Sequence, residues 1–69
     1  MWYTYITQKK DKLYTGITTD IKNRLRQHGN SPLLHQEAFE NKTLAAKKER
    51  EIKGWSKKKK LRLIAKFSL

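Results

Sequence analysis

The most constraining feature of this sequence is a strand period that changes to a helix period at Asp20. Residues 13–18 alternate between two faces and are rich in aromatic and β-branched types, which predicts a half-buried strand. Beyond them, Ile21, Leu25 and His28 recur at i, i+4 and i+7, and Asp20 is placed to cap a helix. The chain is therefore expected to turn directly from a strand into a helix.

Chemically useful side chains gather around this junction. Arg24 falls beside Ile21 on the helix wheel and one turn below His28, so a cation and an imidazole lie at the edge of the packed face. Gly16 shares a strand face with Tyr14, and its missing side chain allows a substrate or a helix to approach the backbone. A bulge or tight packing at Gly16 is the simpler interpretation. A phenol, a fixed cation and a titratable ring at these spacings favour a site.

A second strand is predicted just upstream, over residues 2–7, with a polar turn at residues 8–11. The two strands would then be antiparallel neighbours. Tyr5 and Tyr14 can share one face of this hairpin, near Arg24 at the start of the helix. Cross-strand aromatic packing is the alternative role for both tyrosines.

The rest of the chain alternates turn, strand and helix signals. Residues 29–32 suit a helix end and a turn, and residues 33–39 form a short, irregular candidate for a third strand. A helix is predicted from Asn41 to Lys53, with Asn41 or Thr43 as its cap. A last helix is predicted over residues 57–67, with Ser56 as its cap. The order β-β-α-β-α-α indicates one small α/β (α+β) domain over residues 1–69, with about three antiparallel strands.

One carboxylate stands out in the helix that ends at Lys53. Ala45 and Ile52 cluster on its apolar side, Glu49 borders that side, and Lys48 falls within the apolar stripe. Glu49 could pair with Lys53 at i+4 as an ordinary surface charge. The following helix is expected to dock on the sheet through apolar residues, which are Leu61, Ile64 and Ala65, with Phe67 as an optional fourth.

Charge is the strongest compositional fact. The chain has 17 Lys and Arg against 6 Asp and Glu, a formal charge of +11 on 69 residues. A polyanion is the expected partner, and nucleic acid and anionic lipid both qualify. Four lysines, Lys57 to Lys60, occupy the first turn of the last helix, where they oppose the helix dipole. Their charge is therefore expected to serve binding.

The residue counts also exclude several classes of protein. No cysteine is present for disulfides, and two histidines cannot form a structural zinc site alone. The N-terminal residues do not resemble a signal peptide, and no apolar run approaches membrane-spanning length. We therefore expect a cytoplasmic protein without a membrane span.

Four segments together resemble the small stand-alone bacterial members of the GIY-YIG nuclease superfamily. They are Tyr3-Thr4-Tyr5, Tyr14-Thr15-Gly16, residues 18–28 and residues 45–56. The superfamily includes the N-terminal nuclease domain of the bacterial excision-repair incision subunit and some homing endonucleases. The resemblance implies a three-stranded antiparallel sheet flanked by helices, and metal-dependent cleavage of DNA phosphodiester bonds in repair or recombination.

The resemblance also implies roles for individual residues. Glu49 would hold one divalent ion, Mg²⁺ or Mn²⁺, against the scissile phosphate, a tyrosine would help activate water, and Arg24 would stabilise the developing charge. The residues matching catalytic positions are Tyr5, Tyr14, Arg24 and His28. The residues expected to contact phosphate or DNA are Gly16, Arg26, Lys57, Lys58, Lys59 and Lys60. We expect Tyr5, Tyr14, Arg24 and Glu49 to surround one concave surface.

Two other functions are compatible with the same residues. The first is a catalytically weak nucleic-acid-binding module on this scaffold, and the second is a basic amphipathic protein that meets an anionic membrane or an acidic protein. Set against the superfamily that the chain resembles, the segment between His28 and Asn41 is short. We expect it to lack the basic and aromatic loop of that superfamily and most of a regular third strand.

Overall fold

Three antiparallel strands form one sheet with β1 at its centre, in the order β2-β1-β3. The computed structural model describes residues 1–27, 29 and 31–66, with the backbone of residue 67. The strands are β1 (Trp2–Lys9), β2 (Lys12–Thr18) and β3 (Leu33–Phe39). The helices are α1 (Ile21–Gln27), α2 (Lys42–Lys53) and α3 (Lys57–Phe67). The predicted β-β-α-β-α-α order and α+β class are confirmed.

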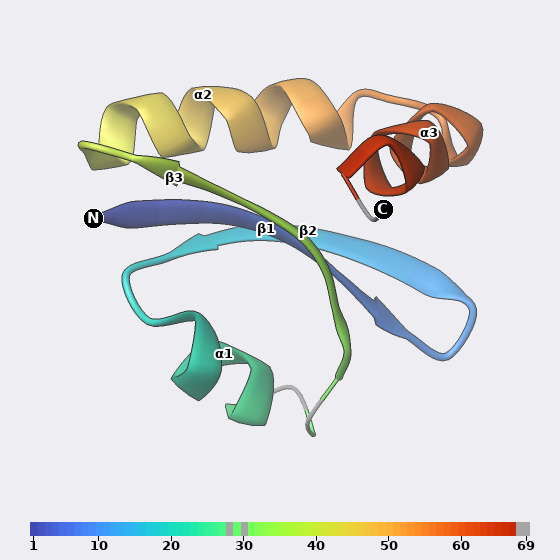
Figure 1. Cartoon of the computed structure of the whole chain (residues 1–69), viewed down its shortest axis with the longest axis horizontal. Helices are drawn as coiled ribbons and strands as arrows, with labels where there is room; N and C mark the ends of the chain where they lie inside the picture. The colour runs from blue at the N-terminus through green and yellow to red at the C-terminus, as the bar shows by residue number, and fades with distance from the viewer. Residues whose placement is uncertain (28, 30, 68–69) are drawn as a thin grey trace.

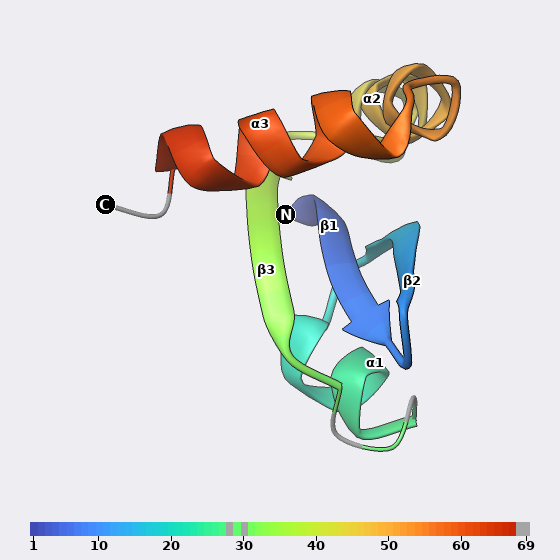
Figure 2. The ribbon, with the colours of Figure 1, turned by 90° about the vertical axis from the view of Figure 1, so that its right-hand side faces the viewer.

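The helices lie on opposite faces of the sheet. Figure 1 shows α2 and α3 on one side of the strands and α1 on the other. In the turned view of Figure 2, α2 is seen nearly end-on above the β2 side, and α3 crosses toward β3. Because side chains alternate along each strand, neighbouring residues of β1 serve the two faces in turn.

Each helix begins at a side chain that caps it. Asp20 Oδ1 accepts from the Asn23 N–H at 3.1 Å, and Asn41 Oδ1 accepts from the Leu44 N–H at 2.9 Å. Ser56 Oγ accepts from the N–H of the residue three positions later at 3.2 Å. These bonds satisfy donors that a helix start leaves free. The predicted caps Asp20 and Ser56 are confirmed, and Asn41 is the cap among the two candidates for α2.

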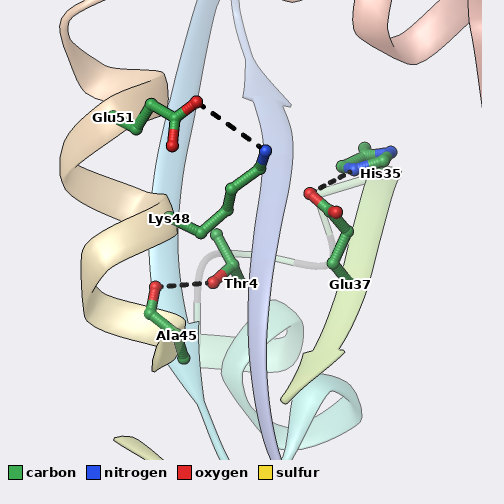
Figure 3. A network of polar contacts seen from close by, with 6 residues as sticks. All are labelled: Thr4, His35, Glu37, Ala45, Lys48 and Glu51. Atoms are coloured by element: carbon green, nitrogen blue, oxygen red, sulfur yellow. Dashed lines mark hydrogen bonds and ion pairs between the residues drawn. The ribbon is translucent and has the colours of Figure 1, made fainter. Parts of the chain in front are cut away.

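The prediction that most of a regular third strand would be missing is wrong. β3 has seven residues and pairs antiparallel with β1, with one register irregularity between Ile6 and Thr7. Its inward face carries the polar pair His35 and Glu37, whose Nε2 and Oε2 atoms are 3.1 Å apart (Figure 3). Polar residues facing inward hide the alternation of apolar and polar types by which a strand is recognised.

The main core lies between β1 and α2. Ile6, Ala45 and Ile52 are fully buried there, and so is the polar side chain of Thr4. Its hydroxyl donates to the Ala45 carbonyl oxygen at 2.7 Å, as Figure 3 shows. This bond joins the central strand to α2, the helix that carries Glu49. It therefore fixes where α2 crosses the sheet.

The docking face of α3 differs from the predicted one. Leu61 and Ala65 are exposed, whereas Leu63 and Ile64 are partly buried and the helix packs against β3. Apolar residues at four of the five positions 61–65 fit two helical faces almost equally well, so the period alone did not select one. The packed face is rotated relative to the expected one, and of the predicted residues Ile64 is partly buried. The Phe67 side chain lies outside the described residues.

We expect Thr4→Val to destabilise the protein by about 0.5–1.5 kcal/mol, because it removes the buried bond to Ala45 while preserving shape. Urea unfolding followed by circular dichroism measures the change. Thr19→Val makes the same chemical change at an exposed position and is the control. An equal effect of the two substitutions would contradict a specific role for the Thr4 hydroxyl.

Candidate active site

The Tyr5 side chain lies across Gly16, its direct partner on the neighbouring strand. A Cβ atom placed on Gly16 would stand 2.6 Å from the Tyr5 hydroxyl oxygen and 2.8 Å from Cζ. Only glycine leaves room for the ring at this position, and Tyr5 is 5% exposed as a result. The simple packing role that the sequence offered for Gly16 is therefore real, and it positions a phenol.

Tyr14 lies on the same face of the sheet as Tyr5, because it is two residues from Gly16 along β2. It pairs with Thr7 of β1 and is 44% exposed. The two phenols thus share a face, as predicted, but differ in environment. The first is buried against the backbone, and the second is open to solvent and to a substrate.

The junction between β2 and α1 is fixed by paired hydrogen bonds. The Asp20 N–H donates to Thr18 Oγ1 at 3.1 Å, and the Thr18 hydroxyl donates to the Asp20 carbonyl oxygen at 3.3 Å. The same carbonyl accepts from the Arg24 N–H at 3.1 Å. The direction in which α1 leaves the sheet is therefore set at its first turn, and with it the position of the exposed Arg24.

Two opposite charges act on the Tyr5 hydroxyl. Burial raises the pKa of Tyr5 above its ordinary value near 10, the Arg24 guanidinium lowers that pKa, and the Glu49 carboxylate raises it further. Tyr5 consequently keeps its proton at neutral pH. The charges of Arg24 on α1 and of Glu49 on α2 therefore both affect the pKa of this one phenol.

Glu49 lies on the helix that covers the other face of the sheet. α2 packs on the side of Thr4, opposite to α1 and to Tyr14, so the prediction that all four groups surround one concave surface is wrong. The carboxylate is 23% exposed and lies 3.5 Å from the Lys53 ammonium. The ion pair that formed the simpler interpretation of Glu49 is therefore present.

The residues present suit a hard cation that keeps most of its water. Among the described residues, no group of three or more acidic, histidine or cysteine side chains could enclose a metal ion. Mg²⁺ is commonly held by one or two carboxylates together with substrate phosphate and water. A single part-buried carboxylate beside a phenol fits this mode and does not fit an all-protein cage.

The remaining predicted site residues fall into two groups. His28 lies outside the described residues, so its predicted role stays a prediction. Arg26, in the last turn of α1, and Lys57, Lys58 and Lys59, in the first turn of α3, are exposed, while Lys60 is partly buried.

Sequence reasoning missed the lysines of the turn between β1 and β2. With Tyr14 they line a hollow at the end of the hairpin; they are Lys9, Lys10 and Lys12. The signal was present, because three of the four residues at 9–12 are lysines. The sequence pattern at residues 9–12 was interpreted only as a polar turn.

Comparison with known proteins assigns the chain to a family. Residues 1–62 match the GIY-YIG catalytic domain, so the chain belongs to the GIY-YIG family. Its relatives include proteins named UPF0213. One from Staphylococcus saprophyticus is 41% identical and covers 91% of this chain and 93% of its own length. One from Haloquadratum walsbyi is 38% identical and covers 88% of this chain and 83% of its own length.

A solved structure shows the same fold. The UPF0213 protein BH0048 from Bacillus halodurans, determined by solution NMR, superposes with a TM-score of 0.69 at 31% identity, over 97% of this chain and 86% of that one. The alignment with the Staphylococcus relative has 76 positions against 69 residues here, so the relative carries residues without a counterpart in this chain.

We expect Gly16→Ala to destabilise the protein by about 1–3 kcal/mol, since the new methyl group would displace the buried Tyr5 ring. Gly54→Ala is the matched control. Gly54 has a right-handed backbone, and a Cβ there would meet the carbonyl oxygens of Glu51 and Arg50 at the ordinary distances of 3.5 and 3.9 Å, so this substitution should be neutral or slightly stabilising. Denaturant unfolding of both variants decides the matter, and equal losses would contradict the Tyr5 contact.

The raised pKa of Tyr5 predicts a specific loss of stability at high pH. The unfolded chain gives up this proton near pH 10, before the folded chain does, so the contribution is complete below pH 10 and is lost as pH rises through the folded pKa. The unfolding free energy of the wild type should fall more steeply there than that of Tyr5→Phe, by at most about 1.4 kcal/mol per pH unit. Parallel pH profiles would contradict the assignment.

Proposed function

We propose that this protein is a metal-dependent endonuclease that hydrolyses DNA phosphodiester bonds, with Mg²⁺ or Mn²⁺ as cofactor. Membership of the GIY-YIG family supports nuclease chemistry on nucleic acid. The observation that carries the proposal is the buried Tyr5 hydroxyl, on which Arg24 and Glu49 both act. We place this activity in the cytoplasm, in DNA repair or recombination.

Each side chain then has one task. Tyr5 is protonated at neutral pH, so its hydroxyl donates a hydrogen bond to an oxygen of the phosphate or to the attacking water. The more exposed Tyr14 orients that water from the solvent side. The Arg24 guanidinium stabilises the negative charge that develops on the phosphate oxygens.

Glu49 is the residue that would hold the divalent ion. When bound, the ion neutralises phosphate charge and polarises the phosphorus–oxygen bond. Lys53 lies 3.5 Å from this carboxylate and competes for it in the absence of a metal. Binding of the ion should therefore release Lys53 toward solvent, where 58% of its side chain is already exposed.

A DNA-binding module without turnover is the second candidate function. The Glu49–Lys53 ion pair favours it, because the carboxylate already has a partner without any metal. The net charge of +11 supports DNA binding under either function. No helix among the described residues is long and apolar enough to cross a membrane.

Glu49→Ala should separate the two functions. We expect single-turnover cleavage in Mg²⁺ or Mn²⁺ to fall by about 10²–10³, the scale of a lost electrostatic stabiliser, while DNA binding persists or tightens because negative charge is removed. Glu51→Ala is the control, since Glu51 lies on the same helix and pairs with Lys48 at 3.9 Å (Figure 3). It should cleave at the wild-type rate.

The outcomes of this assay are distinct. Equal metal-dependent cleavage by the wild type and Glu49→Ala would show that the proposed site is wrong. No cleavage of single-stranded, duplex or branched DNA by the wild type, with binding intact, would establish the binding module. Tyr14→Phe supplies a second check, because it should slow cleavage while retaining the ring and leaving binding nearly unchanged.

A further inference from the structure

The turn between β1 and β2 is bordered by two neighbouring hollows. The first is lined by Tyr14 and by the turn residues 9–12. The second is lined by Asp11, Lys12, Leu13 and two lysines of α3, Lys57 and Lys60. Because both hollows share Asp11 and Lys12, they form one continuous surface. It runs from Tyr14 around the end of the hairpin to the start of α3.

A direct contact holds the two parts of this surface together. The Lys57 ammonium donates to the backbone carbonyl oxygen of Asp11 at 3.2 Å, across 46 positions of sequence. The start of α3 is thereby tied to the hairpin turn. Figure 1 shows both at the right-hand end of the molecule.

The conformation of the turn also favours a role for its lysines. Lys9 pairs with Lys12, which leaves a two-residue turn at Lys10 and Asp11. Lys10 has a φ of 57°, a left-handed conformation that glycine, asparagine and aspartate adopt most readily. Lysine is not among the residues that adopt this conformation most readily, and at this position it adds a cation to an exposed turn.

We propose that this surface, the hairpin track, binds the phosphate backbone of duplex DNA beyond the scissile phosphate. Five lysines carry it: Lys9, Lys10, Lys12, Lys57 and Lys60. Asp11 is the acidic residue between them. The proposal rests on the proposed function, since Tyr14 belongs both to the candidate active site and to the first hollow. A strand positioned at Tyr14 would therefore continue along the lysines.

The partner follows from charge and size. The phosphates of a duplex are regularly spaced, and the lysines of the track lie one after another around the end of the hairpin. Each ammonium can replace a condensed counterion of a phosphate. The longest dimension of the protein is 28 Å, which corresponds to about eight base pairs of duplex. A duplex of about 24 base pairs is therefore long enough to fill the track and extend past Tyr14.

The test compares two double variants with the same change of charge. Lys10→Glu/Lys12→Glu alters the track, and Lys47→Glu/Arg50→Glu alters the outward side of α2, where both residues are exposed and line a separate hollow. Binding to the duplex is measured in EDTA at several salt concentrations, so that no cleavage is required. The track variant should lose about tenfold or more in affinity near 0.15 M salt, and its salt slope should become shallower by about 1.8, whereas the α2 variant should change much less.

A variant with neutral substitutions controls for misfolding of the charge-reversed variant. In Lys10→Asn/Lys12→Gln, asparagine suits the left-handed position, so the turn should be preserved. This variant should show the same shallower slope with a smaller loss of affinity. Circular dichroism confirms the fold of each variant before binding is measured.

Cross-linking locates the surface independently. The chain has no cysteine, so Lys10→Cys and Lys47→Cys can each carry a single photoreactive group. Cross-links to the duplex should form from position 10 and be several-fold weaker from position 47. Equal losses and equal cross-links at both places would overturn the track, and so would stronger effects at α2.

Other partners and a failed nuclease give different results. Preference for phosphatidylglycerol vesicles or an acidic peptide over the duplex, lost in the track variants alone, would replace DNA as the partner. If the wild type binds through the track but cleaves no DNA, the track stands and the proposed nuclease activity fails. If it cleaves while track and α2 variants bind alike, the activity stands and the track fails.

Discussion

The packing of the Tyr5 ring against Gly16 is the contact on which the candidate active site depends. The absence of a Cβ on Gly16 lets a bulky phenol lie flat on the neighbouring strand and become almost fully buried. Burial then keeps the hydroxyl protonated, and Arg24 and Glu49 act on it in opposite directions. One glycine therefore determines where the phenol stands and, by allowing its burial, contributes to its raised pKa.

Much of the fold is determined by local sequence signals, and the helix starts that these signals indicate were predicted correctly. Asp20, Asn41 and Ser56 each cap a helix within three residues of themselves, so sequence alone was sufficient. The regularity of β3 was underestimated because two polar residues, His35 and Glu37, face inward and interact with each other. The docking face of α3 was misplaced because its crowded apolar residues fit more than one helical face.

Some features of the candidate active site could likewise be predicted from the sequence, and others could not. The shared face of Tyr5 and Tyr14 follows from strand alternation once the hairpin register is known, so it was within reach of the sequence. The side from which Glu49 approaches was not, because it depends on how α2 crosses the sheet through the contact with Thr4. The role proposed for Lys10 rests on a turn conformation that composition does not specify.

Neighbouring residues of β1, Thr4 and Tyr5, serve opposite faces of the sheet, and this has a consequence for the order in which the protein assembles. The β1–β2 hairpin closes through a two-residue turn, so Tyr5 meets Gly16 by a contact only eleven residues apart, which forms early and fast. The Thr4 hydroxyl finds the Ala45 carbonyl across 41 residues and therefore closes a much longer loop. The phenol and its glycine should thus be in place before α2 delivers the carboxylate. Under the proposed function, a partly folded chain with only the hairpin formed would carry the Tyr5 phenol and the lysines of the turn but would lack the carboxylate proposed to hold the metal ion.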